Sequence, residues 1–528
     1  ARCPPSATMI ERATFGGIAV TAHHLASSTA IDVLRTGGNA VDAAIAANAV
    51  LGVIAPETCG IGGDLFALIH EPGQSAPSAL NASGRAGSGW HRSRIAGFET
   101  LPLDHPLTVT IPGCVDGWAA LSSAFGALPW GDLLAPAVEI AAGGFAASLE
   151  LAEALQRRHE QLRTEDAAEY LYPGGTPPST RQRLTRPRLA ATLQRIAEEG
   201  RSGFYDGTVG QSMTAATDSA IAATDLARAQ SDWVTPLSAT VFGLTGWTIP
   251  PNSQGYLTLA AASILEQCDP PWDPMDPEFV HLAIEAFRAV AWERDDVVAD
   301  PGAAIPPPAW FLNPDRLAAR ASSISRTATS DWPAAQAQIG GTTFLCVVDD
   351  QGLGISLIQS NFHGIGSGIG VDGHGFLLHN RGAGFSLIPG HPNELRPHHR
   401  PLHTLSPTLW TNNDDLALLM GTRGGHQQPQ LLLQLAAHIL GAGAEPAVAQ
   451  ELPRWAMSQF SAGAPSRVRV ESRMSSEVVG GLERRGHDVT KEMPWLPGWG
   501  PAAVIRVAGD GLRIGAADPR VVTSSTAI

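Results

Sequence analysis

The pattern of apolar and polar positions predicts short strands and long helices along the first part of the chain. The stretch 16–22 (GGIAVTA) is typical of a short apolar strand, and 28–56 has apolar positions at helical spacing on both sides of the Gly-Gly-Asn at 37–39. Glycine commonly ends a helix and asparagine caps the next one, so 28–56 predicts two helices. A glycine-rich turn then leads into a second strand within 59–69.

The middle of the chain is dominated by helical patterns, from about 113 to 200 and again at 277–296. The second of these stretches has an apolar stripe and a charged end, which makes it the clearest single helix. After it, the segment 317–341 consists of small and polar residues with few large apolar ones. That composition predicts a loose, flexible connector.

The last part of the chain is typical of hairpins mixed with helices. Two β-rich runs in 342–361 flank the turn residues 349–352 (DDQG), and a similar pattern surrounds 412–415. The tail at 502–518 again has two β-rich runs around turn residues, while 428–440 has a helical pattern. Hairpins among long helices indicate an α+β fold in which antiparallel sheets are covered by helices.

Composition narrows the function classes. Hydrophobic residues make up 44% and charged residues 16% of the 528, so a large core is expected. The net charge of −15 disfavours nucleic acid and membrane surfaces as partners. The five cysteines are widely spaced without a CxxC pair, which favours small core residues in a reducing, cytoplasmic compartment. A periplasmic or secreted protein remains an alternative if a leader was removed.

The junction between Gly341 and Thr342 is a candidate site of self-cleavage. The connector ends in Gly340-Gly341 and meets Thr342-Thr343 at the start of a strand. Glycine leaves its carbonyl open, and a threonine hydroxyl can attack that carbonyl to form an ester, which water then opens. The new terminal amine, with an ordinary pKa of about 7.7–8.0, can act as base for its own hydroxyl. Taken alone, the tetrapeptide is more often a loop that enters a strand.

Eight blocks of sequence resemble the gamma-glutamyltranspeptidase family, in the order in which the family has them. They are GGNAVDAAIAANAVLGVIAPETCGIGGDLFALI, IPGCVDGW, PPNSQGY, HLAIEAFRAVAWERDD, GGTTFLCVVDDQG, RPLHTLSPTL, GTRGG and AADPR. The resemblance implies an αββα four-layer Ntn-hydrolase sandwich, formed jointly by two chains cut at Gly341–Thr342. The large subunit would be 1–341 and the small subunit 342–528. The two would stay together as a heterodimer, with a dimer of heterodimers left open.

The same resemblance assigns catalytic roles. Thr342 stands at the nucleophile position, and Ser360 stands at that of a second hydroxyl, which steadies the nucleophile's amine. Gly424 and Gly425 match the glycine pair whose backbone N–H groups form an oxyanion hole. Arg85 falls where the family places an arginine against the substrate's α-carboxylate, a pairing that suits a guanidinium fork.

Other positions depart from the glutamyl pocket of true transpeptidases. Phe362 stands where those enzymes carry an asparagine, and Arg381 and Gly384 replace the glutamine and aspartate that hold the substrate's amine. His403 and Thr404 replace a pair of serines. Without the acidic group, an ammonium on the substrate loses its counter-charge. The departures therefore favour an anionic substrate that has no free amine.

Several histidines lie near the candidate site, and their spacing matches no zinc motif, so we expect neither a metal nor a cofactor. Most are expected to be structural or on the surface. His379 and His403 are the two best placed to line the pocket, because they neighbour or replace binding positions.

These observations predict an autoprocessed amidohydrolase, similar to oxamate amidohydrolases and glutaryl-cephalosporin acylases. It would hydrolyse an amide with a carboxylate-bearing acyl group through an acyl-Thr342 ester, with Arg85 and Arg381 on the carboxylate. The alternatives are a true gamma-glutamyl transferase acting on glutathione-like substrates, and a family hydrolase of antibiotic biosynthesis that cleaves a C–C or C–N bond. A binding protein without catalysis is a third alternative, against which Thr342 and Ser360 count.

Overall fold

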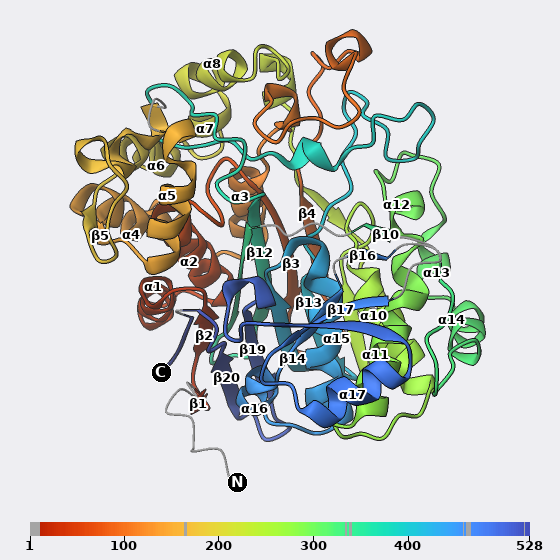
Figure 1. The fold of residues 1–528 in the computed structure, drawn as a ribbon. Coiled ribbons are helices and arrows are strands. Elements are labelled where there is room, and N and C mark those ends of the chain that lie inside the picture. The colour runs from red at the N-terminus through yellow and green to blue at the C-terminus, as the bar shows by residue number, and fades with distance from the viewer. Residues whose placement is uncertain are drawn as a thin grey trace.

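A computed structural model describes residues 11–162, 166–332, 335–336, 341–457, 459–460, 466–521 and 523–528. Its centre is a pair of antiparallel sheets with helices on both outer faces (Figure 1). The first, named here the β11 sheet, has the order β21 (Ser524–Ala527), β2 (Ile18–Thr21), β11 (Gly341–Val348), β12 (Gly354–Phe362), β3 (Asp64–His70), β4 (Ser78–Ala82) and β7 (Asp232–Val234). The second, the β14 sheet, has the order β1 (Glu11–Thr14), β20 (Arg513–Ala517), β19 (Ala502–Val507), β14 (Asp415–Thr422), β13 (Thr408–Asn412), β9 (Leu244–Thr248) and β8 (Leu237–Val241).

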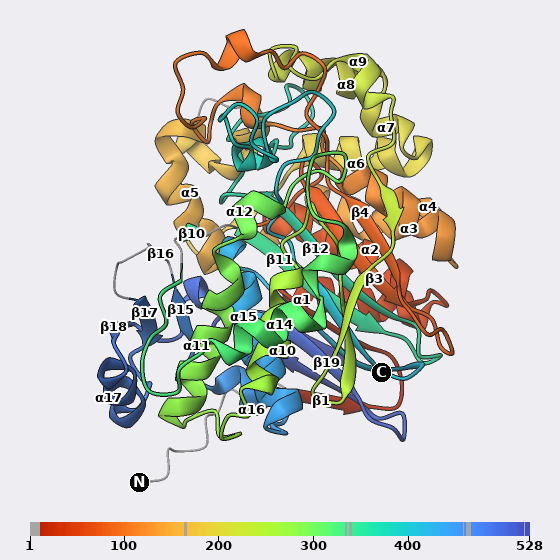
Figure 2. The same cartoon turned by 90° about the vertical axis from the view of Figure 1, so that its right-hand side faces the viewer.

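Helices cover the outer face of each sheet, which gives four layers (Figures 1 and 2). Over the β11 sheet lie α1 (His24–Arg35), α2 (Ala40–Ile54) and α3 (Cys114–Phe125), with α4 (Trp130–Gly143), α5 (Leu149–Leu162) and α6 (Pro187–Glu199) beyond them. Over the β14 sheet lie α10 (Tyr256–Gln267), α11 (Pro277–Ala291) and α15 (Gln428–Ala436). The predicted αββα arrangement is therefore confirmed.

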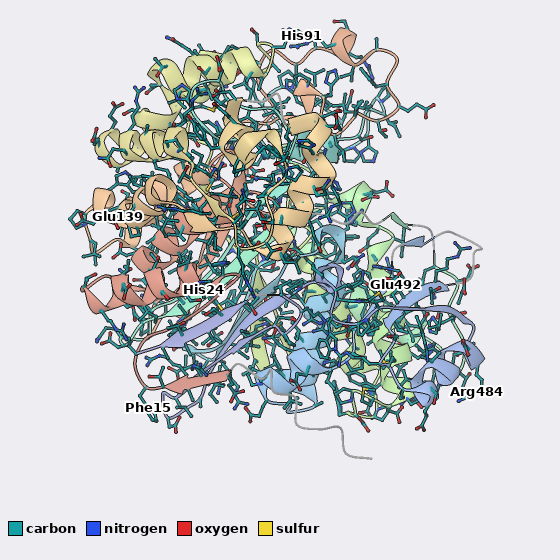
Figure 3. All side chains as sticks on the ribbon, turned by 60° about the vertical axis from the view of Figure 1, so that its left-hand side comes forward. Phe15, His24, His91, Glu139, Arg484 and Glu492 are labelled. Carbon is teal, nitrogen blue, oxygen red and sulfur yellow. The ribbon has the colours of Figure 1, made fainter. Side chains whose placement is uncertain are left out.

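Alternation along the strands explains the layers. In β11, Leu345 and Val347 pack toward the helices of the outer layer, whereas Phe344, Cys346 and Val348 belong to the core between the two sheets. Successive side chains of a strand point to opposite faces, so a continuous apolar run suits a strand that is buried on both sides. Side chains fill the space between the ribbons, while Phe15 lies at the rim with 65% of its surface exposed (Figure 3).

The two halves of the sequence interleave in both sheets. β11 and β12 lie between β2 and β3, which come from the first 70 residues. In the β14 sheet, β13, β14, β19 and β20 lie between β1 on one side and β9 on the other. Each sheet is thus completed only when the segments before and after Gly341 pair with each other.

The two predicted helices in 28–56 are confirmed as α1 and α2. Gly37 has a φ of 94°, which glycine adopts without strain. The Asn39 side chain accepts hydrogen bonds from the backbone N–H groups of Val41 and Asp42, and Asp42 in turn accepts from the Asn39 N–H. This capping box fixes the start of α2. The hairpins predicted around 349–352 and 412–415 are likewise confirmed, as β11–β12 and β13–β14.

The predicted loose connector is wrong over its first residues, because α14 spans Pro314–Ser322. Asn313 caps this helix through a bond to the Arg316 N–H, and Leu317 is buried against the core under the β14 sheet. One apolar face was enough to hold a helix that is otherwise small and charged. Of the remaining connector, 333–334 and 337–340 lie outside the described residues.

Smaller elements surround the four layers. They are α7 (Ser202–Tyr205), α8 (Gly207–Ala216), α9 (Ala223–Leu226), α12 (Arg294–Val297), α13 (Pro308–Phe311), α16 (Pro446–Glu451), α17 (Ser476–Arg484), the paired strands β5 (Phe145–Ala146) and β6 (Arg183–Leu184), the pair β10 (Ala335–Gln336) and β16 (Gln459–Phe460), and the sheet of β15 (Trp455–Met457), β17 (Ser466–Glu471) and β18 (His487–Glu492). The four described cysteines are free thiols, and Cys59, Cys114 and Cys346 are buried as expected. No helix in the described ranges is long and apolar enough to cross a membrane.

Candidate active site

The Gly341–Thr342 junction lies at the first residues of β11, where the strand meets the end of β12. Gly341 pairs with Phe362, and the register shifts between Gly341 and Thr343, so Thr342 sits at a bulge. The Thr342 side chain is buried, and its hydroxyl donates to the Gly341 carbonyl oxygen at 2.8 Å. The structure therefore places the predicted nucleophile against the carbonyl that it would attack.

A second hydroxyl contacts the same carbonyl oxygen. Ser360 Oγ donates to the Gly341 oxygen at 2.6 Å and accepts from the Phe362 N–H at 2.8 Å. It lies 3.3 Å from Thr342 Oγ1. Hydrogen bonds to a carbonyl oxygen leave its carbon more open to attack, and the Ser360 hydroxyl can stay in place as a donor when Thr342 Oγ1 becomes the attacking atom.

Arg381 lies in a 3-10 helix, η5 (Arg381–Gly384), and is completely buried. Its guanidinium stacks on the Phe362 ring at 3.9 Å, and its Nη1 donates to Thr404 Oγ1 at 3.1 Å. Nε and Nη2 have no hydrogen-bond partner among the described residues. Burial lowers the pKa of Arg381 to about 9, against the opposing effect of Asp64, so the group is charged at neutral pH. Two buried cationic donors thus lack an acceptor, which is costly unless a ligand or water supplies one.

Asp64 is the acidic residue of this region, and its carboxylate is already bonded. It accepts from His403 Nε2 at 3.0 Å and from the Gly84 N–H at 2.9 Å, while His379 Nδ1 lies 3.5 Å away. The Leu405 N–H donates to His403 Nδ1, so His403 carries its proton on Nε2. Although burial alone would raise the pKa of Asp64, the neighbouring histidines and Arg381 hold it below its ordinary value.

His379 and His403, the two histidines expected to line the pocket, are both buried. Burial lowers the pKa of His403 to about 3, and burial also lowers that of His379. His379 Nε2 bonds to the Thr110 carbonyl oxygen at 2.8 Å. Both rings are therefore neutral at ordinary pH; His403 donates a hydrogen bond to Asp64, whereas His379 Nδ1 has no hydrogen-bond partner among the described residues.

The predicted glycine pair follows β14. Gly424 and Gly425 have φ values of 133° and 58°, backbone conformations that favour glycine. Gln254 Nε2 donates to the Gly425 and Thr404 carbonyl oxygens at 3.1 Å each, which ties this turn to the segment that carries His403. Gly424 and Gly341 line the same cleft.

That cleft has a volume of about 280 Å³ and opens on the Gly341 side of the junction. Arg423 forms a bidentate pair with Glu150 of α5 at one wall. The full lining is Glu57, Thr58, Glu150, Glu153, Ala154, Arg157, Gly341, Gly364, Arg423, Gly424, Pro497 and Gly498.

Arg85 has a different environment from the other predicted residues. Its Nη2 donates to Asp232 Oδ2 at 2.6 Å, and Arg400 Nη1 donates to the same oxygen at 2.6 Å. The contacts of the Arg85 guanidinium thus run to the far edge of the β11 sheet, whereas contacts link Thr342, Ser360, Phe362, Arg381 and Thr404 into one chain. The substrate-binding role of Arg85 stays a prediction.

Sequence reasoning missed Asp64 and Glu57. Both stand in the block 37–69, and Asp64 opens a strand that is buried along its whole length. An acidic residue at the start of a buried strand needs a buried partner, so the sequence alone could have indicated that Asp64 is paired. The sequence could not identify the partners, since His379 and His403 follow more than 300 residues later.

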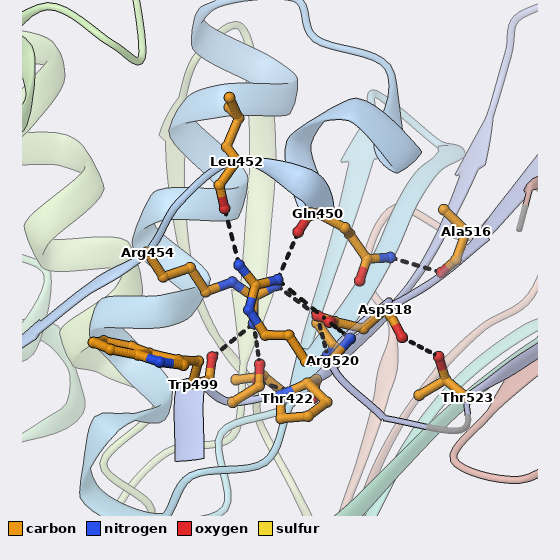
Figure 4. Close-up of polar contacts among 12 residues, drawn as sticks. Thr422, Gln450, Leu452, Arg454, Trp499, Ala516, Asp518, Arg520 and Thr523 are labelled. Carbon is orange, nitrogen blue, oxygen red and sulfur yellow. Dashed lines mark hydrogen bonds and ion pairs between the residues drawn. The ribbon is translucent and has the colours of Figure 1, made fainter. Parts of the chain in front are cut away.

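The C-terminal AADPR block belongs to a buried polar network that also includes Arg454 and Thr422 (Figure 4). Asp518 accepts from Arg454 Nη2 at 2.6 Å and from the Arg520 N–H at 2.9 Å. Arg454 also donates to the Trp499 carbonyl oxygen at 2.7 Å, and Thr422 Oγ1 donates to that of Gly500 at 2.5 Å. This buried network holds the 497–501 segment against the turn that carries Gly424.

We expect Asp518→Asn to lower the free energy of unfolding by about 3–5 kcal/mol, because it leaves two buried arginines short of a counter-charge. Denaturant midpoints on the wild type and the variant measure the loss. The matched control is Glu483→Gln, an exposed carboxylate of α17, which should change the midpoint little. Equal midpoints for Asp518→Asn and wild type would contradict the assignment of this network as a support.

One group of possible metal ligands occurs among the described residues, His281, Glu285 and His487. His281 Nδ1 lies 2.8 Å from His487 Nε2, and its Nε2 bonds to the Ser325 carbonyl oxygen. Glu285 accepts from Arg288 and from the Ser330 N–H. Protein partners thus account for these atoms, and the group joins α11 to β18.

Comparisons with known proteins agree with this geometry. A family model described as gamma-glutamyltranspeptidase matches residues 26–528. The glutathione hydrolase-like YwrD proenzyme of Bacillus subtilis is 33% identical over 508 residues, covering 95% of this chain and 96% of the relative. The oxamate amidohydrolase proenzyme of Klebsiella pneumoniae is 33% identical over 514 residues, covering 96% and 97%. The crystal structure of a cephalosporin acylase from Bacillus halodurans superposes with a TM-score of 0.91 at 29% identity and covers 100% of this chain and 98% of its own. Since the family model spans nearly the whole chain and these relatives align end to end, the chain belongs to the gamma-glutamyltranspeptidase family of Ntn-hydrolases, enzymes that act on amide C–N bonds.

Proposed function

We propose that this chain cuts itself between Gly341 and Thr342 and then hydrolyses an amide whose acyl group carries a carboxylate. Thr342 is the nucleophile of both reactions, and the subunits 1–341 and 342–528 remain together as a heterodimer. The observation that carries the proposal is the pair of hydroxyls, Thr342 and Ser360, on the Gly341 carbonyl oxygen. The proenzyme names of the relatives support processing.

Self-cleavage is an N-to-O acyl shift followed by hydrolysis. Thr342 Oγ bonds to the Gly341 carbonyl carbon, the bond from that carbon to the Thr342 nitrogen breaks, and the hydroxyl proton ends on the nitrogen. Water then opens the ester, which leaves a carboxylate on Gly341 and restores the Thr342 hydroxyl. Ser360 stabilises the oxygen that becomes negative in both steps.

In the cut enzyme, the free amine of Thr342 takes the proton of its own hydroxyl as that hydroxyl attacks the substrate amide. The acyl-Thr342 ester forms, the amine product leaves, and water releases the acid. Backbone N–H groups at Gly424 and Gly425 are the proposed oxyanion donors, since the cleft places Gly424 beside the junction.

Arg381 is the proposed carboxylate site. Its free Nε and Nη2 need an acceptor, and a carboxylate meets that need bidentately. An ammonium cannot accept a hydrogen bond, and the nearby Asp64 carboxylate is already occupied by His403 and Gly84. These contacts favour an oxamate-like or glutaryl-like acyl group over the gamma-glutamyl group, whose amine would face Arg381.

Two measurements test the proposal. Intact mass of the purified protein should show two fragments that meet at Gly341–Thr342, and oxamate and glutaryl amides should be hydrolysed in preference to a gamma-glutamyl chromogenic amide. A preference for the gamma-glutamyl amide would instead support the true transferase. A chain that stays whole and hydrolyses nothing would support the binding protein.

Ser360→Ala is expected to slow self-cleavage about tenfold, the loss of one hydrogen bond worth about 1.4 kcal/mol in the transition state. The fraction cut over time, read by mass, gives the rate. Ser356→Ala is the matched control, since Ser356 lies on the same strand with a buried hydroxyl that has no partner in the described chain. Cleavage of Ser360→Ala at the control's rate would remove Ser360 from the reaction.

A further inference from the structure

The cleft at the junction holds a buried acid that the proposed mechanism does not use. Glu57 follows the end of α2 and is 8% exposed, and its backbone carbonyl lies 2.9 Å from the point where a side chain on Gly341 would begin. Glu57 Oε2 has no hydrogen-bond partner among the described residues. A buried carboxyl oxygen without a partner calls for an explanation, such as a catalytic role or a bound water.

Among the residues that the structure describes, the hydrogen-bond partners of the Thr342 hydroxyl include no group that readily moves protons. The two hydrogen-bond partners of Thr342 Oγ1 are the Gly341 carbonyl oxygen and the Ser360 hydroxyl, and neither is a base of useful strength. The amine that serves in the cut enzyme is still a peptide nitrogen in the whole chain, so it cannot accept the proton at the start. Self-cleavage therefore needs an acid or base from another part of the site.

We propose that Glu57 is the proton carrier for self-cleavage at Gly341–Thr342. The inference rests on the proposed autoprocessing. As the new C–O bond forms, one carboxyl oxygen of Glu57 accepts the Thr342 hydroxyl proton. As the C–N bond breaks, the other oxygen gives its proton to the Thr342 nitrogen. Glu57 ends as it began, and no further reactant is consumed. Glu57 and Gly341 line the same cleft, whose volume of about 280 Å³ has room for waters, and waters relay protons over gaps too long for one hydrogen bond.

The surroundings keep this carboxyl protonated. Burial, reinforced by the charge of Glu150, raises the pKa of Glu57 to about 8, and Arg423 and Arg186 reduce the effect only partly. An acid that is protonated at neutral pH and titrates near 8 is matched to giving and taking protons at working pH. The groups that face Glu57 or line the same cleft are Cys59 on its own loop, Glu150, Glu153 and Arg157 on α5, Arg186 before α6, and Arg423 after β14.

The test is the pH dependence of self-cleavage in Glu57→Gln, which keeps the shape of the protonated acid and cannot carry a proton. The uncut chain is isolated after brief cell-free synthesis and moved to buffers between about pH 6 and 9.5, a range that brackets the raised pKa of Glu57 of about 8. Cleavage is then followed by intact mass. We expect wild-type cleavage to slow above pH 8 and the variant to be at least about tenfold slower at pH 7, without that inflection. Glu57→Asp should recover part of the rate.

Controls separate this inference from the proposed function. Glu139→Gln changes a surface carboxylate on α4 (Figure 3) and should cleave as the wild type does. Equal melting temperatures show that Glu57→Gln is folded. Wild-type rates in Glu57→Gln, or slow cleavage with an unchanged pH profile, would overturn the role of Glu57 while leaving Thr342 as nucleophile. A wild type that never cuts would instead overturn the proposed function.

Discussion

Thr342→Ala is expected to leave one uncut chain with no amidase activity. The hydroxyl that lies 2.8 Å from the Gly341 oxygen supplies the only attacking atom in the proposed cleavage. Its removal takes away both the processing reaction and the nucleophile of the mature enzyme, so the loss should exceed about a thousandfold in each. Intact mass reads the first effect, and hydrolysis of an oxamate or glutaryl amide reads the second.

The matched control is Thr343→Ala, one residue further along β11. Thr343 is equally buried, and its hydroxyl has no partner in the described chain, so its removal should leave cleavage intact. Thr342→Ser keeps a hydroxyl and should still cut. A Thr342→Ala protein that appears as two fragments would show that another residue, or a contaminating protease, breaks the chain.

Arg381→Met is expected to lower kcat/KM for anionic acyl amides about a hundredfold or more. The variant keeps an unbranched chain against Phe362 and loses two charge-assisted hydrogen bonds to a buried carboxylate, together worth about 3 kcal/mol. For a glutaryl amide the loss should appear mainly in KM, since that carboxylate lies away from the reacting bond, whereas in oxamate the carboxylate is attached to the reacting carbonyl carbon and kcat should fall as well.

A substrate pair provides the internal control for Arg381. An amide with an uncharged acyl group of the same length should lose little, because it never used the guanidinium. Self-cleavage should also persist, which shows that the variant folds. Equal losses for the charged and the uncharged substrates would mean that Arg381 only supports the structure, and the proposed acyl group would have to be reconsidered.

Local patterns predicted most of the fold. Alternation and turn residues located β11 and β12, and the glycines and asparagine at 37–39 located the α1–α2 turn, because each of these signals lies within one element. α14 was missed since its single large apolar residue, Leu317, stands among arginines and serines. Its stability comes from tertiary packing, which cannot be inferred from a short stretch of sequence.

The sequence indicated which residues form the candidate site, but it did not indicate the contacts among them. The sequence pointed to Thr342, Ser360 and Arg381, yet it could not show that Arg381 is buried on the Phe362 ring with two donors free. Nor could it show that the Arg85 guanidinium donates a hydrogen bond to the Asp232 carboxylate. Such facts depend on strands and loops that are distant in sequence, and only the folded chain brings them together.

The interleaved strands have a consequence for the enzyme at low concentration. If the chain is cut as proposed, β11 and β12 would stay hydrogen-bonded to β2 and β3, so separating the two polypeptides would require both sheets to open. Activity per molecule should therefore be the same at nanomolar and at micromolar protein, unlike that of enzymes assembled from independently folded subunits. One translation product would thus fix a one-to-one stoichiometry of the two proposed subunits, which dilution should not disturb.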